Sequence, residues 1–304
     1  MWRVRGSGEN AEISPAHPTG FDTGPGPPEP TTRLAREKIA SHGRVVSMSD
    51  ELVHYSVARG TATITLDSPH NRNALSAQLR RELRASLVKA HDDAAVRVIV
   101  LTHTGKVFCS GMDLKEARGA DASAQGVNEF PEILHQLWSS PKPVVARLTG
   151  PARAGGVGMV AAADIVVAAR EATFAFSEVR VGVVPAIISL TVLPRIAPRA
   201  AQELFLTGEV FDAERAAQIG LITAAVDAER LDAEVDRYVN ALALGGPQAL
   251  AATKELLVSP KPPTPSAGFE AMNALSARFF ASAEGQEGIT AFAQKRRPNW
   301  VPSE

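Results

Sequence analysis

The segment Pro143-Val-Val-Ala-Arg-Leu-Thr-Gly-Pro-Ala-Arg-Ala-Gly-Gly-Val-Gly-Met-Val-Ala-Ala-Ala-Asp164 predicts a buried strand, a turn rich in glycine and proline, and a helix of small residues. Glycines at a helix start leave backbone N–H groups bare at the surface of a pocket, where the helix dipole adds partial positive charge. Such a site suits an oxygen atom that gains negative charge during a reaction.

Two other interpretations of the same glycines stay open on this segment alone. Gly156-x-Gly158-x-x-Ala161 has the form of a dinucleotide-binding fingerprint. That fingerprint needs its first glycine directly after the strand, and here seven residues separate Leu148 from Gly156. Glycines also allow two helices to pack tightly, which is a purely structural use.

The composition describes an ordinary globular protein. The chain has 304 residues, of which 45% are hydrophobic and 21% charged, and its net charge is −1. This balance gives no reason to expect nucleic acid or an anionic membrane as a partner, and no apolar run is long enough to span a bilayer. The single cysteine, Cys109, fits a reducing compartment, so we expect a cytoplasmic protein without disulfides. Few histidines and no second cysteine leave a metal site without support.

The N-terminal segment differs in composition from the rest of the chain, where strand-like runs recur. Residues 1–47 are rich in proline and glycine without apolar periodicity, so we expect a disordered extension. Strands are predicted at 53–58, 61–66, 96–101, 144–148 and 165–169. The later ones each lead into a glycine-containing loop and then a helix. This repetition predicts an α/β fold built as a spiral of ββα units.

The remaining segments are predicted to be helical. A helix after Ser76 carries a row of basic side chains, Arg80, Arg81, Arg84 and Lys89, which we place on its outer face; a solvated surface or an RNA-binding stripe would explain them. From Leu193 onward we expect helices without strands between them, at 200–206, 212–219, 228–244, 247–258 and 268–293.

Three motifs together resemble those of one enzyme family. Phe108-Cys-Ser-Gly-Met-Asp-Leu114 resembles the F-x-A-G-x-D-L signature of the enoyl-CoA hydratase/isomerase (crotonase) superfamily. Ala154-Gly-Gly-Val-Gly-Met-Val-Ala-Ala-Ala-Asp164 resembles its G-G-G-x-E-L-x-x-x-C-D segment, and Phe174-Ala-Phe-Ser-Glu-Val-Arg-Val-Gly-Val-Val-Pro185 resembles its F-x-x-P-E-x-x-x-G-x-x-P segment. The similarity covers about residues 50 to 300 in one collinear order.

The resemblance implies a crotonase spiral over residues 48–245 and a helical region over 246–304 that assembles homotrimers or hexamers. It implies an acyl-CoA substrate and no separate cofactor. The thioester oxygen would be held by the amides of Ser110 and Gly155. The residues matched to coenzyme A binding are Arg72, Ala74, Met112, Asp113 and Leu114, with Lys295 reaching the phosphates from a neighbouring subunit.

One departure from the family pattern bears on the chemistry. Family hydratases use two glutamates; this chain keeps the second as Glu178 and has Gly158 at the first. A carboxylate beside Phe176 and Val179 should have a raised pKa, which suits it to give and take a proton, although a salt bridge with Arg180 is the plainer interpretation. Arg153 could contact a substrate carboxylate or be an exposed loop residue, and Cys109 is expected to be a packing residue.

The predicted activity is therefore that of a lyase, an enoyl-CoA hydratase that adds water to a 2-enoyl-CoA. Gly158 together with Pro185-Ala-Ile-Ile-Ser189 is similar to a bacterial subgroup of methylglutaconyl-CoA hydratases. A double-bond isomerase, a thioester hydrolase and a non-catalytic acyl-CoA binder are the alternatives.

Overall fold

The structure is a computed structural model that describes residues 51–117, 129–259 and 264–302. The chain divides into two units between Val45 and Val46, and every described residue belongs to the second unit. The predicted disordered extension, residues 1–47, lies outside the described residues. The boundary between a core at 48–245 and a helical region at 246–304 stays a prediction.

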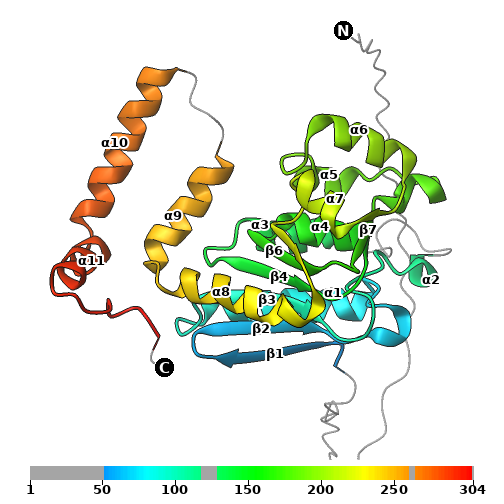
Figure 1. The fold of residues 1–304 in the computed structure, drawn as a ribbon, viewed down its shortest axis with the longest axis horizontal. Coiled ribbons are helices and arrows are strands. Elements are labelled where there is room, and N and C mark those ends of the chain that lie inside the picture. Colours follow the sequence, from blue (N-terminus) through cyan, green and yellow to red (C-terminus); the bar gives the residue numbers. More distant parts are fainter. Residues whose placement is uncertain (1–50, 118–128, 260–263, 303–304) are drawn as a thin grey trace, which may run out of the picture. The chain divides into compact units, whose positions relative to one another are not determined.

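A twisted sheet runs through the second unit (Figure 1). Among the described residues it has six strands, in the spatial order β1 (Val53–Ala58), β2 (Thr61–Leu66), β3 (Val98–His103), β4 (Val144–Leu148), β6 (Ile165–Ala169) and β9 (Ala224–Val226). β1 is antiparallel to β2, and the later neighbours are parallel. The strands predicted at 53–58, 61–66, 144–148 and 165–169 are confirmed at these bounds.

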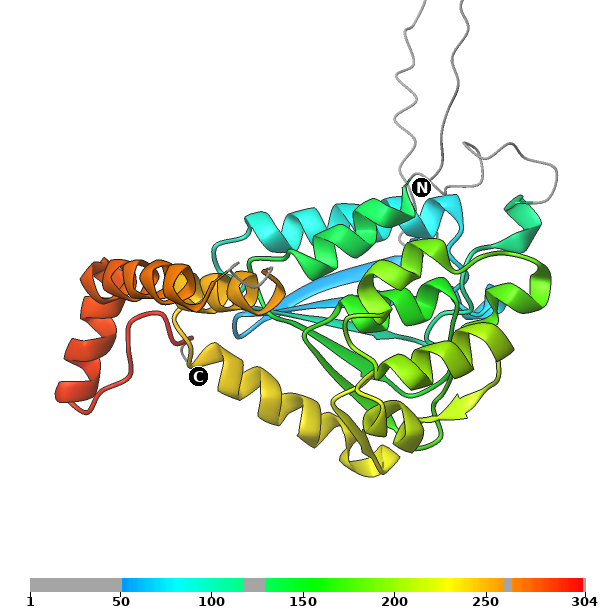
Figure 2. The same ribbon diagram turned by 90° about the horizontal axis from the view of Figure 1, so that it is seen from above.

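Both faces of this sheet are covered, which explains its continuous apolar strands. Successive side chains of β3 point to opposite faces: Ile99 and Leu101 enter the main hydrophobic core, and Val98 and Val100 enter a smaller one. Helix α1 (Ala77–Asp92) packs on the first face and α8 (Leu231–Ala243) on the second, as Figure 2 shows.

A smaller sheet positions the candidate site. In the described part of the chain its strands are, in order, β5 (Ala152–Arg153), β7 (Thr173–Ala175) and β8 (Phe211–Asp212). β4 and β5 contribute one strand to each sheet before α4 (Gly155–Ala162), and β6 and β7 do the same before α5 (Ala186–Val192). The predicted α/β spiral of ββα units is therefore confirmed.

The other helices complete the unit. They are α2 (Leu114–Ala117), α3 (Phe130–Trp138), α6 (Pro198–Thr207), α7 (Ala213–Gln218), α9 (Pro247–Val258), α10 (Pro265–Ala281) and α11 (Ala283–Ala293), with short 3-10 turns at η2 (Pro69–Asn71), η3 (Ser177–Val181) and η4 (Ala228–Arg230). Helices α9 to α11 follow one another at the C-terminal end of the chain (Figure 1).

The expectation of late helices without strands was wrong. β8 and β9 lie between them, because each pairs with a strand distant in sequence: β8 with β7, and β9 with β6. The single helix predicted at 268–293 is two helices. Ser282 is extended, with φ −70° and ψ 156°, and its hydroxyl accepts the N–H of Gly285 at 2.9 Å, which ends one helix and starts the next.

The basic row on α1 is also corrected. Ser76 caps this helix as predicted, but Arg80 is buried, with 3% of its surface exposed. Its guanidinium donates to the carbonyl of Leu75 at 2.5 Å and to the carboxylate of Glu129 at 3.2 Å. Arg80 is therefore not available to bind RNA, because its side chain is buried and bonded within the protein.

Candidate active site

Three predicted site residues leave the same edge of the smaller sheet. β5 and β7 are parallel neighbours, and Cys109 forms a parallel bridge to Ala152 on β5. Ser110, Gly155 and Glu178 follow these three segments within a few residues. Because the carboxyl ends of parallel strands meet at one edge, the three residues are brought to a common place.

Gly155 presents an open backbone donor there. It is the first residue of α4, and its N–H finds no acceptor anywhere in the described ranges. The preceding residue, Ala154, has φ 46° and ψ −119°. Glycine adopts this conformation freely, whereas an L side chain there costs roughly 1–3 kcal/mol. Strain of this kind collects at functional sites, and here it aims the amide at the start of a helix.

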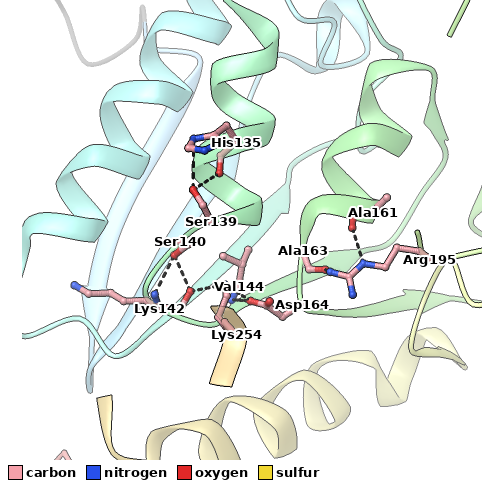
Figure 3. A network of polar contacts seen from close by, with 10 residues as sticks. All are labelled: His135, Ser139, Ser140, Lys142, Val144, Ala161, Ala163, Asp164, Arg195 and Lys254. Carbon is pink, nitrogen blue, oxygen red and sulfur yellow. Dashed lines mark hydrogen bonds and ion pairs between the residues drawn. The ribbon is translucent and has the colours of Figure 1, made fainter. Parts of the chain in front are cut away.

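The other end of α4 is anchored by charged side chains (Figure 3). The carbonyl of Ala161 accepts from Nε of Arg195 at 3.2 Å. Asp164, directly after the helix, accepts from the N–H of Val144 at 2.7 Å and from Nζ of Lys254 at 2.5 Å. Cations near a helix C-terminus stabilise it, so α4 is held firmly while its first turn stays open.

The loop of Ser110 lies against the start of α4. A Cβ at Gly111 would come within 2.9 Å of the Ala154 Cβ and 3.6 Å of the Gly155 nitrogen. The Ser110 N–H itself donates to the carbonyl of Arg72 at 3.1 Å. The two predicted oxyanion donors are therefore close together but differ, since Ser110 already has a partner.

Glu178 lies in η3 with one carboxylate oxygen buried. Among the described residues this Oε2 atom has no hydrogen-bond partner, and Glu178 makes no ion pair, so the salt bridge with Arg180 is not found. Burial raises the pKa of Glu178, as predicted from its apolar neighbours. Nearby in the sequence, the ring of Phe176 packs on that of Phe205, with centroids 4.4 Å apart. A partly buried carboxyl group with one unpaired oxygen and a raised pKa is typical of an acid/base catalyst.

A sequence model of the enoyl-CoA hydratase/isomerase family matches residues 56–302. The chain belongs to this family. A protein of Rhodobacter capsulatus named "Probable enoyl-CoA hydratase" is 36% identical over 274 residues, which are 84% of this chain and 99% of that protein. Among solved structures, an enoyl-CoA hydratase/isomerase from Marinobacter aquaeolei is 30% identical with a TM-score of 0.77, covering 83% of this chain and 99% of that one. Pseudomonas aeruginosa AtuE is 34% identical with a TM-score of 0.76, covering 83% and 100%.

These similarities confirm the crotonase superfamily and its fold. The methylglutaconyl-like subgroup stays a prediction.

The residues matched to coenzyme A binding in this hydratase/isomerase family member lie on two loops that contact each other. Arg72 and Ala74 follow η2, and Met112, Asp113 and Leu114 lead into α2. Leu75 bridges to Met112, and the N–H of Leu75 donates to the Gly111 carbonyl at 2.8 Å. The structure therefore brings these five residues together. Lys295 is exposed and follows α11, and in both ribbon views the helices α11 and α2 lie at opposite ends of the second unit.

Asn73 joins the two loops and was missed from the sequence. Its backbone is left-handed, with φ 51°, and its side chain donates to the carbonyls of Thr104 at 3.1 Å and Val107 at 2.7 Å. Its oxygen accepts the N–H of Ser68 at 2.6 Å. Asparagine tolerates this conformation. The Pro69-His-Asn-Arg-Asn73 turn was the available signal, although it did not name the distant partners.

Two further predicted residues have structural roles. Cys109 is fully buried, and burial raises the pKa of its thiol to about 12, so its expected role in packing is confirmed. The guanidinium of Arg153 donates to the carbonyl and hydroxyl of Thr173, at 2.6 and 2.8 Å. Arg153 is thus neither an exposed loop residue nor free to bind a substrate carboxylate without giving up those bonds.

Two hollows lie away from these loops. A groove of about 1080 Å³ beneath α8 includes Thr63, Arg147 and Asp232, and one of about 880 Å³ between α9 and α10 includes Leu256 and Phe269. Neither contains a predicted site residue. Over the described ranges no group of three His, Cys, Asp or Glu side chains could hold a metal ion. No helix of that part of the chain has the length and apolarity to cross a membrane.

Proposed function

We propose that this protein is a lyase that adds water reversibly across the double bond of a 2-enoyl-CoA. The observation that carries the proposal is the buried, unpartnered Oε2 of Glu178 at the same sheet edge as the open N–H of Gly155. Within the described residues, neither the Oε2 atom of Glu178 nor the N–H of Gly155 has a hydrogen-bond partner.

In this mechanism, Glu178 moves both protons. Its carboxylate takes a proton from water as the water oxygen bonds to the β-carbon, and the pair of electrons of the double bond shifts toward the thioester as an enolate. The protonated carboxyl then gives that proton to the α-carbon, which restores the carboxylate. A pKa raised by burial suits one group to both steps.

The enolate oxygen would be held by backbone donors. The Gly155 N–H is already open and lies at the positive end of α4. The Ser110 N–H would be the second donor, shared between the Arg72 carbonyl and the thioester oxygen. Each well-placed donor of this kind is worth about 3 kcal/mol of the barrier.

A second candidate activity is migration of the double bond between carbons of the acyl chain. The observation that favours it is Gly158, where a Cβ would lie 2.6 Å from Cγ2 of Ile188. A side chain there would collide with Ile188, so the first of the two family carboxylates is missing, and an isomerase needs one base only. A non-catalytic acyl-CoA binder would share the binding loops and lack both activities.

The substrate and the assembly are further parts of the proposal, and membership of the family supports them. We propose a branched or carboxylated acyl chain, as in methylglutaconyl-CoA, on coenzyme A bound by Arg72, Ala74, Met112, Asp113 and Leu114. The reactive group being part of the substrate, no separate cofactor is needed. Lys295 would come from a neighbouring copy in a homotrimer or hexamer. Large exposed apolar residues of the C-terminal helices support such an assembly; they include Leu257, Phe269, Phe280 and Phe292. We place the protein in the cytoplasm.

The test is the loss of absorbance of the conjugated enoyl thioester when purified protein is mixed with crotonyl-CoA or with 3-methylglutaconyl-CoA. Loss of the band with a 3-hydroxyacyl product establishes hydration and ranks the two substrates. Appearance of the band from a 3-enoyl-CoA, without hydration, would establish the isomerase instead. Tight binding of the CoA ester without either change would leave the non-catalytic binder.

A further inference from the structure

Gly158 on α4 faces α5 at very short range. A Cβ built at Gly158 would lie 2.6 Å from Cγ2 of Ile188, 3.2 Å from Cβ of Ile188 and 3.5 Å from Cδ1 of Leu134. Cβ atoms in proteins do not approach other atoms to less than about 3.0 Å. Even an alanine at position 158 would therefore require α4 or α5 to move.

Ile188 cannot easily turn away. It is β-branched, which restricts rotation about its first side-chain bond within a helix. Thr191, one turn later on α5, donates its hydroxyl to the carbonyl of Gly158 at 3.1 Å, and both residues are buried. The same face of α5 thus contacts Gly158 at its α-carbon and at its carbonyl oxygen.

Position 158 matches the family position that carries the first glutamate of two-carboxylate hydratases. We propose that Ile188 keeps this a one-carboxylate site, because its Cγ2 methyl fills the space that a carboxylate side chain at position 158 would need and so leaves Glu178 to move every proton. This inference rests on the proposed enoyl-CoA chemistry, and it gives a physical reason for the pairing of Gly158 with the Pro185-Ala-Ile-Ile-Ser189 segment.

The first test measures packing alone, in the full chain and without substrate. Gly158→Ala should lower the thermal midpoint by roughly 3–10 °C, because it overpacks a buried contact. Adding Ile188→Leu removes the Cγ2 methyl at constant atom count and should restore at least half of that loss. Ile187→Leu, the same change one residue earlier on α5, is the matched control and should restore none. Losses that simply add in the double variant would overturn the proposal.

The second test measures reaction type. Gly158→Glu with Ile188→Leu should raise the ratio of water addition to double-bond migration, on one enoyl-CoA substrate, at least about tenfold over Gly158→Glu alone and over Ile188→Leu alone. An unchanged ratio in a folded double variant overturns this role of Ile188. If the glutamate variant does not fold, the alanine pair still decides whether Ile188 fills the space.

The two tests separate this inference from the proposed function. Rescue of stability by Ile188→Leu in a protein that neither hydrates nor isomerises any enoyl-CoA would refute the proposed function while leaving the packing relation intact. Turnover of enoyl-CoA without such rescue would refute the inference and leave the function.

Discussion

The two ends of helix α4 are built in opposite ways. At its C-terminal end, polar groups are paired: Arg195 binds the Ala161 carbonyl, and Asp164 binds Lys254 and the Val144 amide. At its N-terminal end, within the described residues, the Gly155 N–H has no partner, and Ala154 is held in a strained conformation. Because the polar groups at the C-terminal end are paired and the Gly155 N–H is not, the N-terminal end of α4 belongs to the candidate site and the C-terminal end to the scaffold that supports it.

Glu178 extends this contrast and gives the largest expected effect. Glu178→Gln keeps the shape and removes the acid/base group, so kcat/KM for the enoyl-CoA should fall by about 10²- to 10⁴-fold while CoA-ester affinity changes little. Glu171→Gln, the same change at an exposed turn residue after β6, is the control. Full activity of the Glu178 variant would remove this residue from its role.

Gly155→Ala should give the next largest effect. A Cβ there would lie 2.8 Å from Cδ1 of Leu75 and 3.1 Å from Cζ of Phe130, so these buried side chains or the first turn of α4 must shift. Displacing one oxyanion donor costs about 10²-fold in kcat. Steady-state kinetics on the same substrate measures it; a change in KM alone would mean that the amide serves binding and not the reaction.

Lys254→Met changes a contact at the C-terminal end of α4, away from the candidate site. It leaves Asp164 without its cation, and the pair is only partly exposed, at 11% for Lys254 and 24% for Asp164. We expect a loss of about 2 kcal/mol in the free energy of unfolding, with kcat nearly unchanged. Arg237→Met, which removes a more exposed partner of Glu234, should lower the free energy of unfolding clearly less in the same denaturation experiment, because solvent screens this pair. Equal losses would contradict the distinction.

Ala154→Gly should relieve strain at the open end. With φ at 46°, glycine at this position is expected to raise the free energy of unfolding by about 1 kcal/mol. The control is Ala163→Gly at the other end of α4, where φ is −70° and glycine should lower the stability by roughly 0.5–1 kcal/mol. A loss of stability from both substitutions would show that Ala154 is not strained.

The smallest effect is a pH dependence of stability from Glu178. Burial raises its pKa in the folded protein, so its contribution to stability is complete below the ordinary carboxyl pKa of 4.5 and is lost as pH rises through the folded value. The thermal midpoint of the wild type should therefore fall relative to that of Glu178→Gln as the pH is raised from about 4 to 8. A constant difference across this range would argue against a raised pKa.

The sequence predicted those features that depend on local pattern. Four of the five predicted strands appear at their expected bounds, and the fifth, predicted at 96–101, lies two residues later as β3. Ser76 caps α1, and apolar neighbours correctly indicated a raised pKa for Glu178. The family resemblance also indicated that the loops of Ser110 and Gly155 approach each other.

Features that depend on distant partners could not be predicted in the same way. Arg80 is buried because Glu129, 49 residues later, supplies a carboxylate. β9 forms because a three-residue segment pairs with β6, which is distant from it in the sequence. The tight contact of Gly158 with Ile188 needs the packing of two helices, and the partner of the Ser110 amide, the Arg72 carbonyl, comes from another loop. No regular spacing of residues in the sequence marks any of these contacts.

The central claim is that Glu178 moves a proton at the α-carbon of an enoyl-CoA held at the start of α4. The most direct measurement is hydration in heavy water, with mass spectrometry and NMR of the product for the wild type and Glu178→Gln. The account predicts a 3-hydroxyacyl-CoA with one deuterium on the α-carbon from the wild type, and neither product nor deuterium from the variant over the same time. A product that lacks deuterium at the α-carbon, or deuterium incorporation by Glu178→Gln at the wild-type rate, would contradict it.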